Sequence, residues 1–148
     1  MIAEDEATTE ETRHASIADG WTGVVPTMLA IGIGGIIGAN LRWKIGVWAA
    51  DQWATPFPWG TLLINLTGSF VLGLYLTLVT ERFTGRPLTR LMFATGLLGA
   101  YTTFSTFAYE TVRLLQHGQI WTALGYVAAS LALGLAACTG GIATGRAI

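Results

Sequence analysis

Residues 99–110 read GAYTTFSTFAYE and lie inside a segment that is otherwise apolar enough for a membrane helix. The stretch combines Gly99 with the adjacent β-branched residues Thr102 and Thr103, which all weaken a helix. A broken helix in lipid leaves backbone groups unsatisfied, so it survives only where protein surrounds it or where it lines a cavity. Its carbonyls can then bind a cation. The stretch therefore predicts an unwound segment near residues 99–103 that offers backbone oxygens to a small hard ion.

The composition around this stretch is typical of a membrane protein. Of 148 residues, 52% are hydrophobic and only 11% are charged, whereas soluble domains have about 25% charged residues. Residues 1–19 contain six acids and one base, so they carry a net charge of −5 against +4 for the rest of the chain. Such a start does not match a secretory signal. We interpret residues 1–20 as a disordered acidic tail and residues 21–148 as the membrane domain.

Four segments contain no Asp, Glu, Lys or Arg, namely residues 20–41, 52–80, 91–109 and 114–145. Each can hold the ~20 residues that a membrane helix needs. The predicted spans are residues 24–43, 59–80, 91–113 and 120–144. All six tryptophans fall at or outside the ends of these spans, where the headgroup region favours them. The expected fold is an all-α membrane protein with four transmembrane helices, the third of them broken.

Basic residues are divided almost evenly between the two sides of the predicted bundle. One side has Arg42, Lys44 and Arg113. The other has Arg82, Arg86, Arg90 and Arg146, with Arg13 in the tail. Because Lys/Arg asymmetry normally sets orientation, this chain could insert either way, and two copies could meet as an antiparallel pair. A fixed orientation set by the arginines at 82, 86 and 90 is an equally good interpretation.

Small residues recur every four positions in the first span. Gly34 is followed by Gly38, and Gly35 by Ala39. This spacing lets helix backbones approach closely. It predicts tight packing of the first span, within or between subunits, and indicates no chemistry.

Polar residues also recur every four positions, so that they share helix faces. The second span has Thr61, Asn65 and Ser69, and the fourth has Tyr126 and Ser130. A buried amide needs partners, so Asn65 either joins two helices or donates into a polar path. The hydroxyls can bond to their own helices, and taken alone they are more often structural.

In the third span, Phe104 and Phe107 are neighbours on one helix face. Their electropositive ring edges could face an anion, although most such pairs are simply packed in apolar surroundings. Ser105 and Thr106 between them make a purely apolar role less persuasive. Glu110 needs a partner or water, and Arg113, three residues on, could pair with it.

Arg42, at the end of the first span, could lie in a vestibule. It could equally be an interfacial anchor, as could Arg113.

The chain resembles the bacterial fluoride channels of the Fluc/CrcB type. The resemblance rests on GGIIGANLR at 34–42, GTLLINLTGSF at 60–70 and TTFSTF at 102–107, and it covers essentially everything after the tail. Ala100 and Tyr101 depart from the residues common in the family, and Tyr101 adds a hydroxyl without an obvious partner.

The resemblance implies a dual-topology homodimer in lipid with two fluoride pathways and a structural sodium ion at the dimer interface. Gly99 and Thr102 would supply backbone carbonyls to sodium. Phe104 and Phe107 would face fluoride with their ring edges, and Asn65 would donate from its amide. The residues that would line or flank the pathway are Thr61, Ser105, Thr106, Ser130, Tyr126 and Glu110.

The expected function is passive, fluoride-selective export across the bacterial cytoplasmic membrane, which would lower fluoride toxicity in the cell. No enzyme motif appears in the sequence, and we expect neither enzymatic activity nor a nucleic-acid partner. One alternative is a small four-span drug/proton exporter, although that chemistry needs a carboxylate deep in the bundle and Glu110 lies near a span end. The other is a membrane scaffold that transports nothing.

Overall fold

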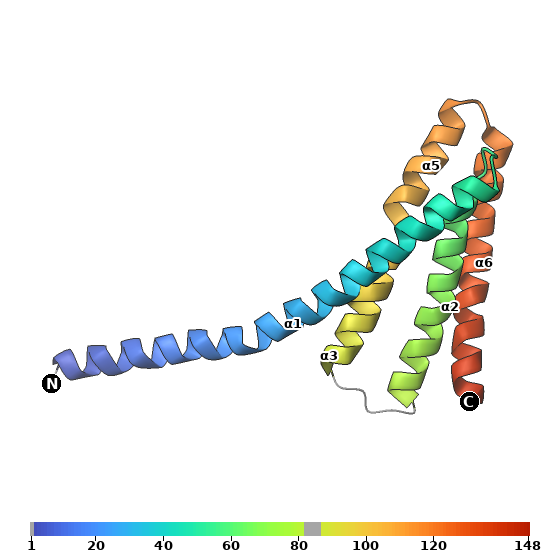
Figure 1. Cartoon of the computed structure of the whole chain (residues 1–148). Coiled ribbons are helices and arrows are strands. Elements are labelled where there is room, and N and C mark those ends of the chain that lie inside the picture. Colours follow the sequence, from blue (N-terminus) through green and yellow to red (C-terminus); the bar gives the residue numbers. More distant parts are fainter. Residues whose placement is uncertain (1, 82–86) are drawn as a thin grey trace.

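The computed structural model describes residues 2–81 and 87–148, with side chains from residue 23 onward. These described parts are helical apart from turns and short links (Figure 1). In chain order the elements are α1 (Ile2–Gln52), α2 (Trp59–Glu81), α3 (Pro87–Arg90), the π-helix η1 (Leu91–Leu98), α4 (Gly99–Tyr101), α5 (Phe104–Gln116) and α6 (Ile120–Ala147). No strand occurs among them.

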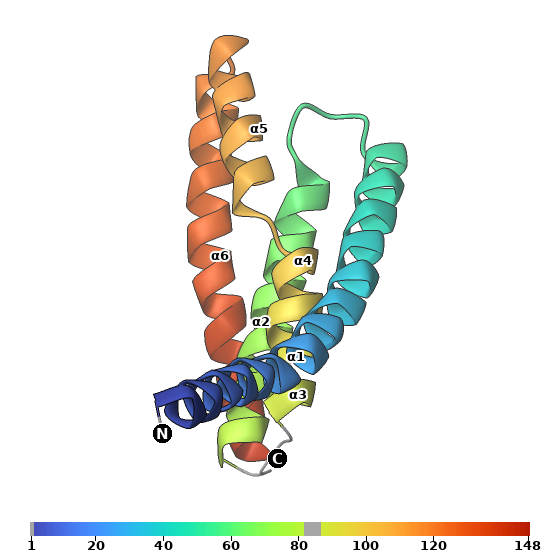
Figure 2. The ribbon, with the colours of Figure 1, turned by 90° about the vertical axis from the view of Figure 1, so that its left-hand side faces the viewer.

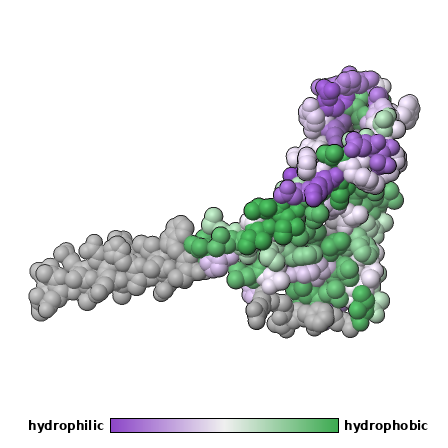
Figure 3. Space-filling view, viewed as in Figure 1, coloured by the Kyte–Doolittle hydropathy of each residue, from purple (hydrophilic) through white to green (hydrophobic). Residues whose placement is uncertain are grey.

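Within the described residues, three helices are long and apolar enough to cross a membrane. They are Gly23–Gln52 within α1, Trp59–Glu81 (α2) and Ile120–Ala147 (α6). Apolar side chains form a broad band on the visible face of the molecule, and polar side chains gather at one end of it (Figure 3). These helices agree with the first, second and fourth predicted spans.

The third predicted span is divided into pieces, as residues 99–110 suggested. Thr102 has φ −80° and ψ 158°, and Thr103 has φ −151° and ψ 117°, so both are extended. We call them the 102–103 link. Gly99 stays helical because its backbone N–H still bonds to Ala94 O and Gly96 O at the end of η1. The predicted unwinding is thus confirmed, but it is confined to the link instead of reaching back to Gly99.

The N-terminal segment differs from the expected disordered tail, since α1 already begins at Ile2. Residues 2–19 contain neither glycine nor proline and are rich in alanine and glutamate, which favour helix. The N-terminal end of α1 lies away from the other helices (Figure 1).

The glycine spacing in α1 produces the close packing that the sequence predicted. A Cβ on Gly34 would run into the carbonyl oxygen of Met92, and one on Gly38 into that of Leu97. The backbones of α1 and η1 therefore touch at these two positions. A Cβ on Gly35 would lie 4.0 Å from its nearest neighbour, the carbonyl oxygen of Gly96. The second predicted pair, Gly35 and Ala39, is therefore not a site of such close backbone contact.

A second glycine contact joins α2 to α6, which run side by side (Figure 2). A Cβ on Gly73 would overlap the carbonyl of Cys138, and one on Gly141 would overlap the carbonyl of Phe70. Close approach of α2 and α6 brings their polar faces to one side, against α5. This arrangement positions the candidate site.

Candidate functional site

The 102–103 link is held by Asn65 on α2. Asn65 Oδ1 accepts from Thr103 N at 2.9 Å, and Asn65 Nδ2 donates to Thr103 O at 3.1 Å. One side chain thus satisfies both backbone groups of a residue that has left the helix. Asn65 thus joins α2 to the third span, at the link and not at a helix. Its amide nitrogen retains a second hydrogen.

Thr103 also explains why α5 begins at Phe104. Its Oγ1 accepts from Thr106 N at 3.2 Å and caps the new helix. The same hydroxyl donates to Thr106 Oγ1 at 3.0 Å and lies 3.3 Å from Ser105 Oγ. The hydroxyls of Ser105 and Thr106, which were predicted to flank a pathway, are therefore gathered around Thr103.

A cavity of about 320 Å³ lies beside the link, and we call it the Asn65 cavity. Its walls bring together four predicted pathway residues: Asn65, Phe104, Phe107 and Ser130. Ser130 Oγ is buried and has no hydrogen-bond partner in the described part of the chain. A buried hydroxyl without a partner costs about 1–3 kcal/mol, so this atom is suited to a bound ion or water.

The two phenylalanines differ in their surroundings. Their ring centroids are 5.7 Å apart with planes inclined at 45°. Phe107 packs against Tyr126 at 5.2 Å, whereas Phe104 is 79% exposed. Phe104 therefore presents most of its ring outside the single chain, to lipid or to another subunit.

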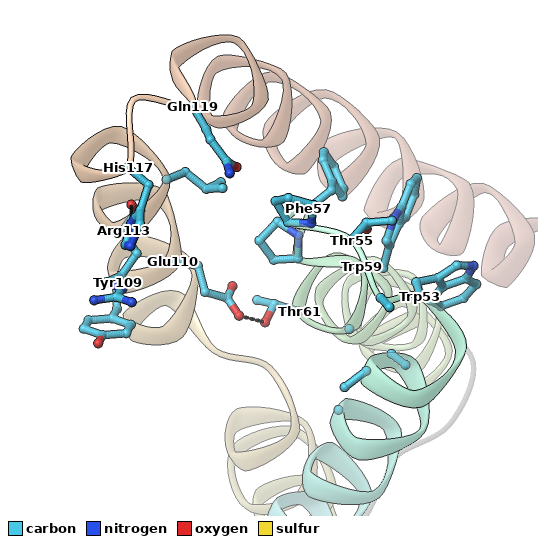
Figure 4. Close-up of a pocket in the computed structure, with 18 residues that line it drawn as sticks. Trp53, Thr55, Phe57, Trp59, Thr61, Tyr109, Glu110, Arg113, His117 and Gln119 are labelled. Carbon is cyan, nitrogen blue, oxygen red and sulfur yellow. Dashed lines mark hydrogen bonds between the residues drawn. The ribbon is translucent and has the colours of Figure 1, made fainter.

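One helical turn from the Asn65 cavity, three helices contribute the Glu110 cluster, which consists of Thr61, Glu110 and Tyr126. Thr61 Oγ1 donates to Glu110 Oε1 at 2.9 Å, and Tyr126 Oη donates to Glu110 Oε2 at 2.7 Å. The predicted partner Arg113 makes no ion pair with this carboxylate among the described residues. Figure 4 shows Glu110 directed toward Thr61, with Arg113 farther out along α5. The hydroxyls take its place because α2 and α6 bring them to the inner side of α5.

A larger depression of about 770 Å³ opens beside the Glu110 cluster. Thr61 and Glu110 contribute to its wall, together with the loop between α1 and α2 and the end of α5 (Figure 4). It lies at the end of the molecule where polar side chains gather (Figure 3). Water can therefore reach the neighbourhood of the carboxylate from this end.

The two sites follow one another along the same helices. Thr61 and Asn65 are one turn apart on α2, and Tyr126 and Ser130 are one turn apart on α6. The depression, the Glu110 cluster and the Asn65 cavity thus form a row of polar groups between α2, α5 and α6. We call this row the polar path.

The remaining predicted residues have different positions. Gly99 and Thr102 line the Asn65 cavity, whereas Arg42 lies half-buried on α1 and lines neither cavity. Sequence reasoning missed the bond between Tyr101 Oη and Thr67 Oγ1, which are 2.8 Å apart. A tyrosine inside an apolar span indicates that its hydroxyl has a hydrogen-bond partner. Thr67 could not be named from the sequence, because it lies 34 residues from Tyr101 in the chain.

These features define a multi-pass helical membrane protein with a polar path beside a broken helix. Residues 29–142 match the model of the family described as CrcB-like protein, Camphor Resistance (CrcB), and the chain belongs to that family. The resemblance inferred from the three sequence motifs is therefore confirmed.

Curated relatives cover most of the chain. A Chloroflexus aurantiacus protein is 50% identical over 119 residues, which is 80% of this chain and 94% of the relative. An Acidobacterium capsulatum protein is 48% identical over 120 residues (81% and 96%), and a Rhizobium meliloti protein is 40% identical over 121 residues (82% and 97%). Each of these relatives is named a fluoride-specific ion channel.

Proposed function

We propose that this chain forms a fluoride-selective ion channel. The observation that carries the proposal is the polar path, with the unpartnered hydroxyl of Ser130 inside the Asn65 cavity. Family membership supports it, because relatives that are 40–50% identical are named as fluoride-specific ion channels. Ion channels are not enzymes, and the protein transports its ion without chemical conversion.

The path provides what a small, strongly hydrated anion requires. Fluoride must exchange its water for hydrogen-bond donors, which Ser130 and the second amide hydrogen of Asn65 can supply. Phe104 and Phe107 add ring edges with a positive electrostatic character and exclude bulk water. The described residues that line the cavity include no lysine or arginine, so an anion is not held so strongly that its exit becomes slow.

The direction of flow follows from the electrochemical gradient. Hydrogen fluoride crosses membranes as a neutral weak acid and releases fluoride in a less acidic cytoplasm. A negative cell interior favours anion exit by about 2.3 kcal/mol per 100 mV. A passive channel in the bacterial cytoplasmic membrane therefore exports fluoride and lowers its toxicity.

The assembly we propose is a homodimer of two four-span chains in opposite orientations. In each chain, η1, α4 and α5 together make the broken third span. The exposure of Phe104 supports this assembly, because a second copy would cover a ring that lies on the wall of the Asn65 cavity yet is 79% exposed. The even distribution of basic residues is compatible with insertion in both orientations.

A structural sodium ion between the two copies is also part of the proposal. The carbonyl of Gly99 lacks its regular helical donor, because the N–H of Thr103 donates to Asn65. The carbonyl of Thr102 is in the same situation, because the N–H of Thr106 donates to Thr103 Oγ1. These two oxygens from each copy fit a small hard cation. These carbonyl oxygens would coordinate sodium, and the ion would connect the 102–103 links of the two copies.

Sodium removal tests this part of the proposal. Exchange of the purified protein into sodium-free N-methylglucamine buffer should lower its thermal unfolding temperature and its fluoride flux. At sodium concentrations 100 times the dissociation constant, binding would stabilise the native state by about 2.7 kcal/mol. Adding sodium back should restore both properties, while equal amounts of N-methylglucamine should not. Identical unfolding curves with and without sodium would rule out the site.

Fluoride efflux from liposomes, read with a fluoride electrode, tests the channel function. Wild-type protein should release fluoride and retain chloride. Phe107→Ile should lower the fluoride rate at least about tenfold, equivalent to about 1.4 kcal/mol on the barrier, because an aliphatic side chain has no positive ring edge.

Phe70→Ile is the matched control, since Phe70 lies on α2 but does not line the Asn65 cavity. It should leave the rate unchanged. If folded wild-type protein releases no fluoride, the channel proposal fails and the scaffold alternative gains support. Uptake of a cationic drug driven by a proton gradient in the same liposomes would instead support the exporter alternative.

A further inference from the structure

We propose that Tyr101 is a positioning residue for the fluoride path. Its hydroxyl, bonded to Thr67, sets the place where the 102–103 link crosses α2. The inference rests on the proposed channel function and deepens it, because it names a residue outside the polar path that controls the path's geometry.

Tyr101 Oη and Thr67 Oγ1 are 2.8 Å apart, a distance at which either hydroxyl can donate. The hydroxyl of Thr67 has a single hydrogen, and two carbonyls of its own helix are in reach of it, Leu63 O at 2.7 Å and Ile64 O at 3.2 Å. Because these carbonyls can only accept, we assign Tyr101 as the donor and Thr67 as the acceptor. Tyr101 is only 8% exposed, and its ring belongs to an apolar cluster with Ile64 and Leu98.

Gly68 leaves the space that the link needs to cross α2. A Cβ on Gly68 would overlap the methyl group of Thr102 and would come within 3.2 Å of the Tyr101 ring. The two bonds to α2 lie on either side of this crossing. Asn65 and Thr67 are two residues apart, which is about 200° around a helix, so they face nearly opposite directions. The chain from Tyr101 to Thr103 is thus attached to α2 on both sides.

This double attachment fixes the groups that follow in the chain. Thr103 carries both the Asn65 bonds and the cap of α5, and Phe104 comes directly after it. Without the Tyr101 bond, only the Asn65 side would hold the link. The link could then shift along α2, and Phe104 and the Thr103 backbone would move relative to the donors of the path.

The test compares fluoride efflux per folded dimer for matched variants. Tyr101→Phe keeps the ring and removes only the hydroxyl, and Thr67→Val keeps the shape and removes the acceptor. Each should lower the fluoride rate about three- to tenfold, the range expected for one hydrogen bond. Thr67→Ser, which retains a hydroxyl, should keep the wild-type rate. The double variant Tyr101→Phe/Thr67→Val should be no slower than either single variant, because both changes remove the same bond.

Tyr75→Phe is the control for removal of a tyrosine hydroxyl. Tyr75 Oη donates to Thr89 O at 3.3 Å, away from the link, and its loss should not change the rate. Wild-type rates for both Tyr101→Phe and Thr67→Val, or additive losses in the double variant, would overturn the inference.

Amide hydrogen exchange gives a readout that does not depend on transport. Tyr101→Phe should speed exchange of the Thr103 amide about three- to tenfold relative to the wild type, while amides in the middle of α6 should be unaffected. Unchanged exchange at Thr103 would also overturn the inference. Absence of fluoride flux in the wild-type protein would overturn the channel function instead, so the two failures are distinguishable.

Discussion

Asn65→Leu is expected to lower the fluoride rate at least about a hundredfold, equivalent to about 2.7 kcal/mol on the barrier. Leucine has nearly the same size as asparagine but offers neither donor nor acceptor. The N–H and C=O of Thr103 would both lose their partner. Each unsatisfied backbone group costs about 1–3 kcal/mol in a buried site, so the 102–103 link would leave its position and the cavity would lose its amide donor as well.

The measurement pairs liposome efflux with thermal unfolding of the same preparation. Asn40→Leu is the matched control, because Asn40 Nδ2 donates to Ile36 O of its own helix at 2.7 Å and is exposed. It should keep the wild-type rate and nearly the wild-type stability. An Asn65→Leu protein that conducts fluoride within threefold of the wild type would show that the Asn65 bonds are dispensable.

The second large effect is expected at the contact between α1 and η1, where Gly38→Val should prevent folding of the native bundle. The first atom of any side chain at this position would overlap the carbonyl of Leu97 and approach the N–H of Tyr101 to 3.0 Å. Both obstacles are backbone atoms, which cannot rotate away as a flexible side chain can. Overpacking in a core costs typically about 1–3 kcal/mol, and a clash between two backbones should exceed that range.

Size-exclusion chromatography in detergent and fluoride efflux are the measurements. The Gly38→Val protein should aggregate or elute heterogeneously and release no fluoride. Gly32→Val on the same helix is the control, since a Cβ there would meet nothing within 4 Å. A monodisperse, conducting Gly38→Val protein would contradict the packing described for α1 and η1.

Several parts of the fold follow from local sequence alone. Long uncharged segments predicted the membrane-length helices near 24–43, 59–80 and 120–144, because hydropathy sums over neighbouring residues. Gly99 and the β-branched pair Thr102 and Thr103 predicted an unwound stretch over residues 99–103, of which only Thr102 and Thr103 have left the helix. Four-residue spacing also placed Thr61 and Asn65 on one face of α2, since the helix period is 3.6 residues.

The hydrogen-bond partners of the polar side chains could not be predicted from local sequence. Glu110 has a nearby arginine in the sequence, yet it bonds to hydroxyls that lie 49 and 16 residues away in the chain. Asn65 was left open between a helix-joining role and a donor role, and only its two bonds to one residue, Thr103, showed which backbone it serves. The helix over residues 2–19 was not predicted from the sequence. The acidic charge of this segment suggested disorder, whereas its individual residues have favourable helix propensities.

By itself, the sequence determined that this protein is a membrane protein with a broken span. It also determined that polar residues share one face of α2 and that glycines four residues apart allow α1 to pack closely against another helix. These properties depend on composition and on spacing along one helix. The tertiary structure decided that Asn65 and Tyr101 hold the 102–103 link from opposite sides of α2, that hydroxyls surround Glu110, and that Ser130 faces a cavity without a partner. These properties depend on how α2, α5 and α6 approach one another, because hydrogen bonds act only over about 3 Å.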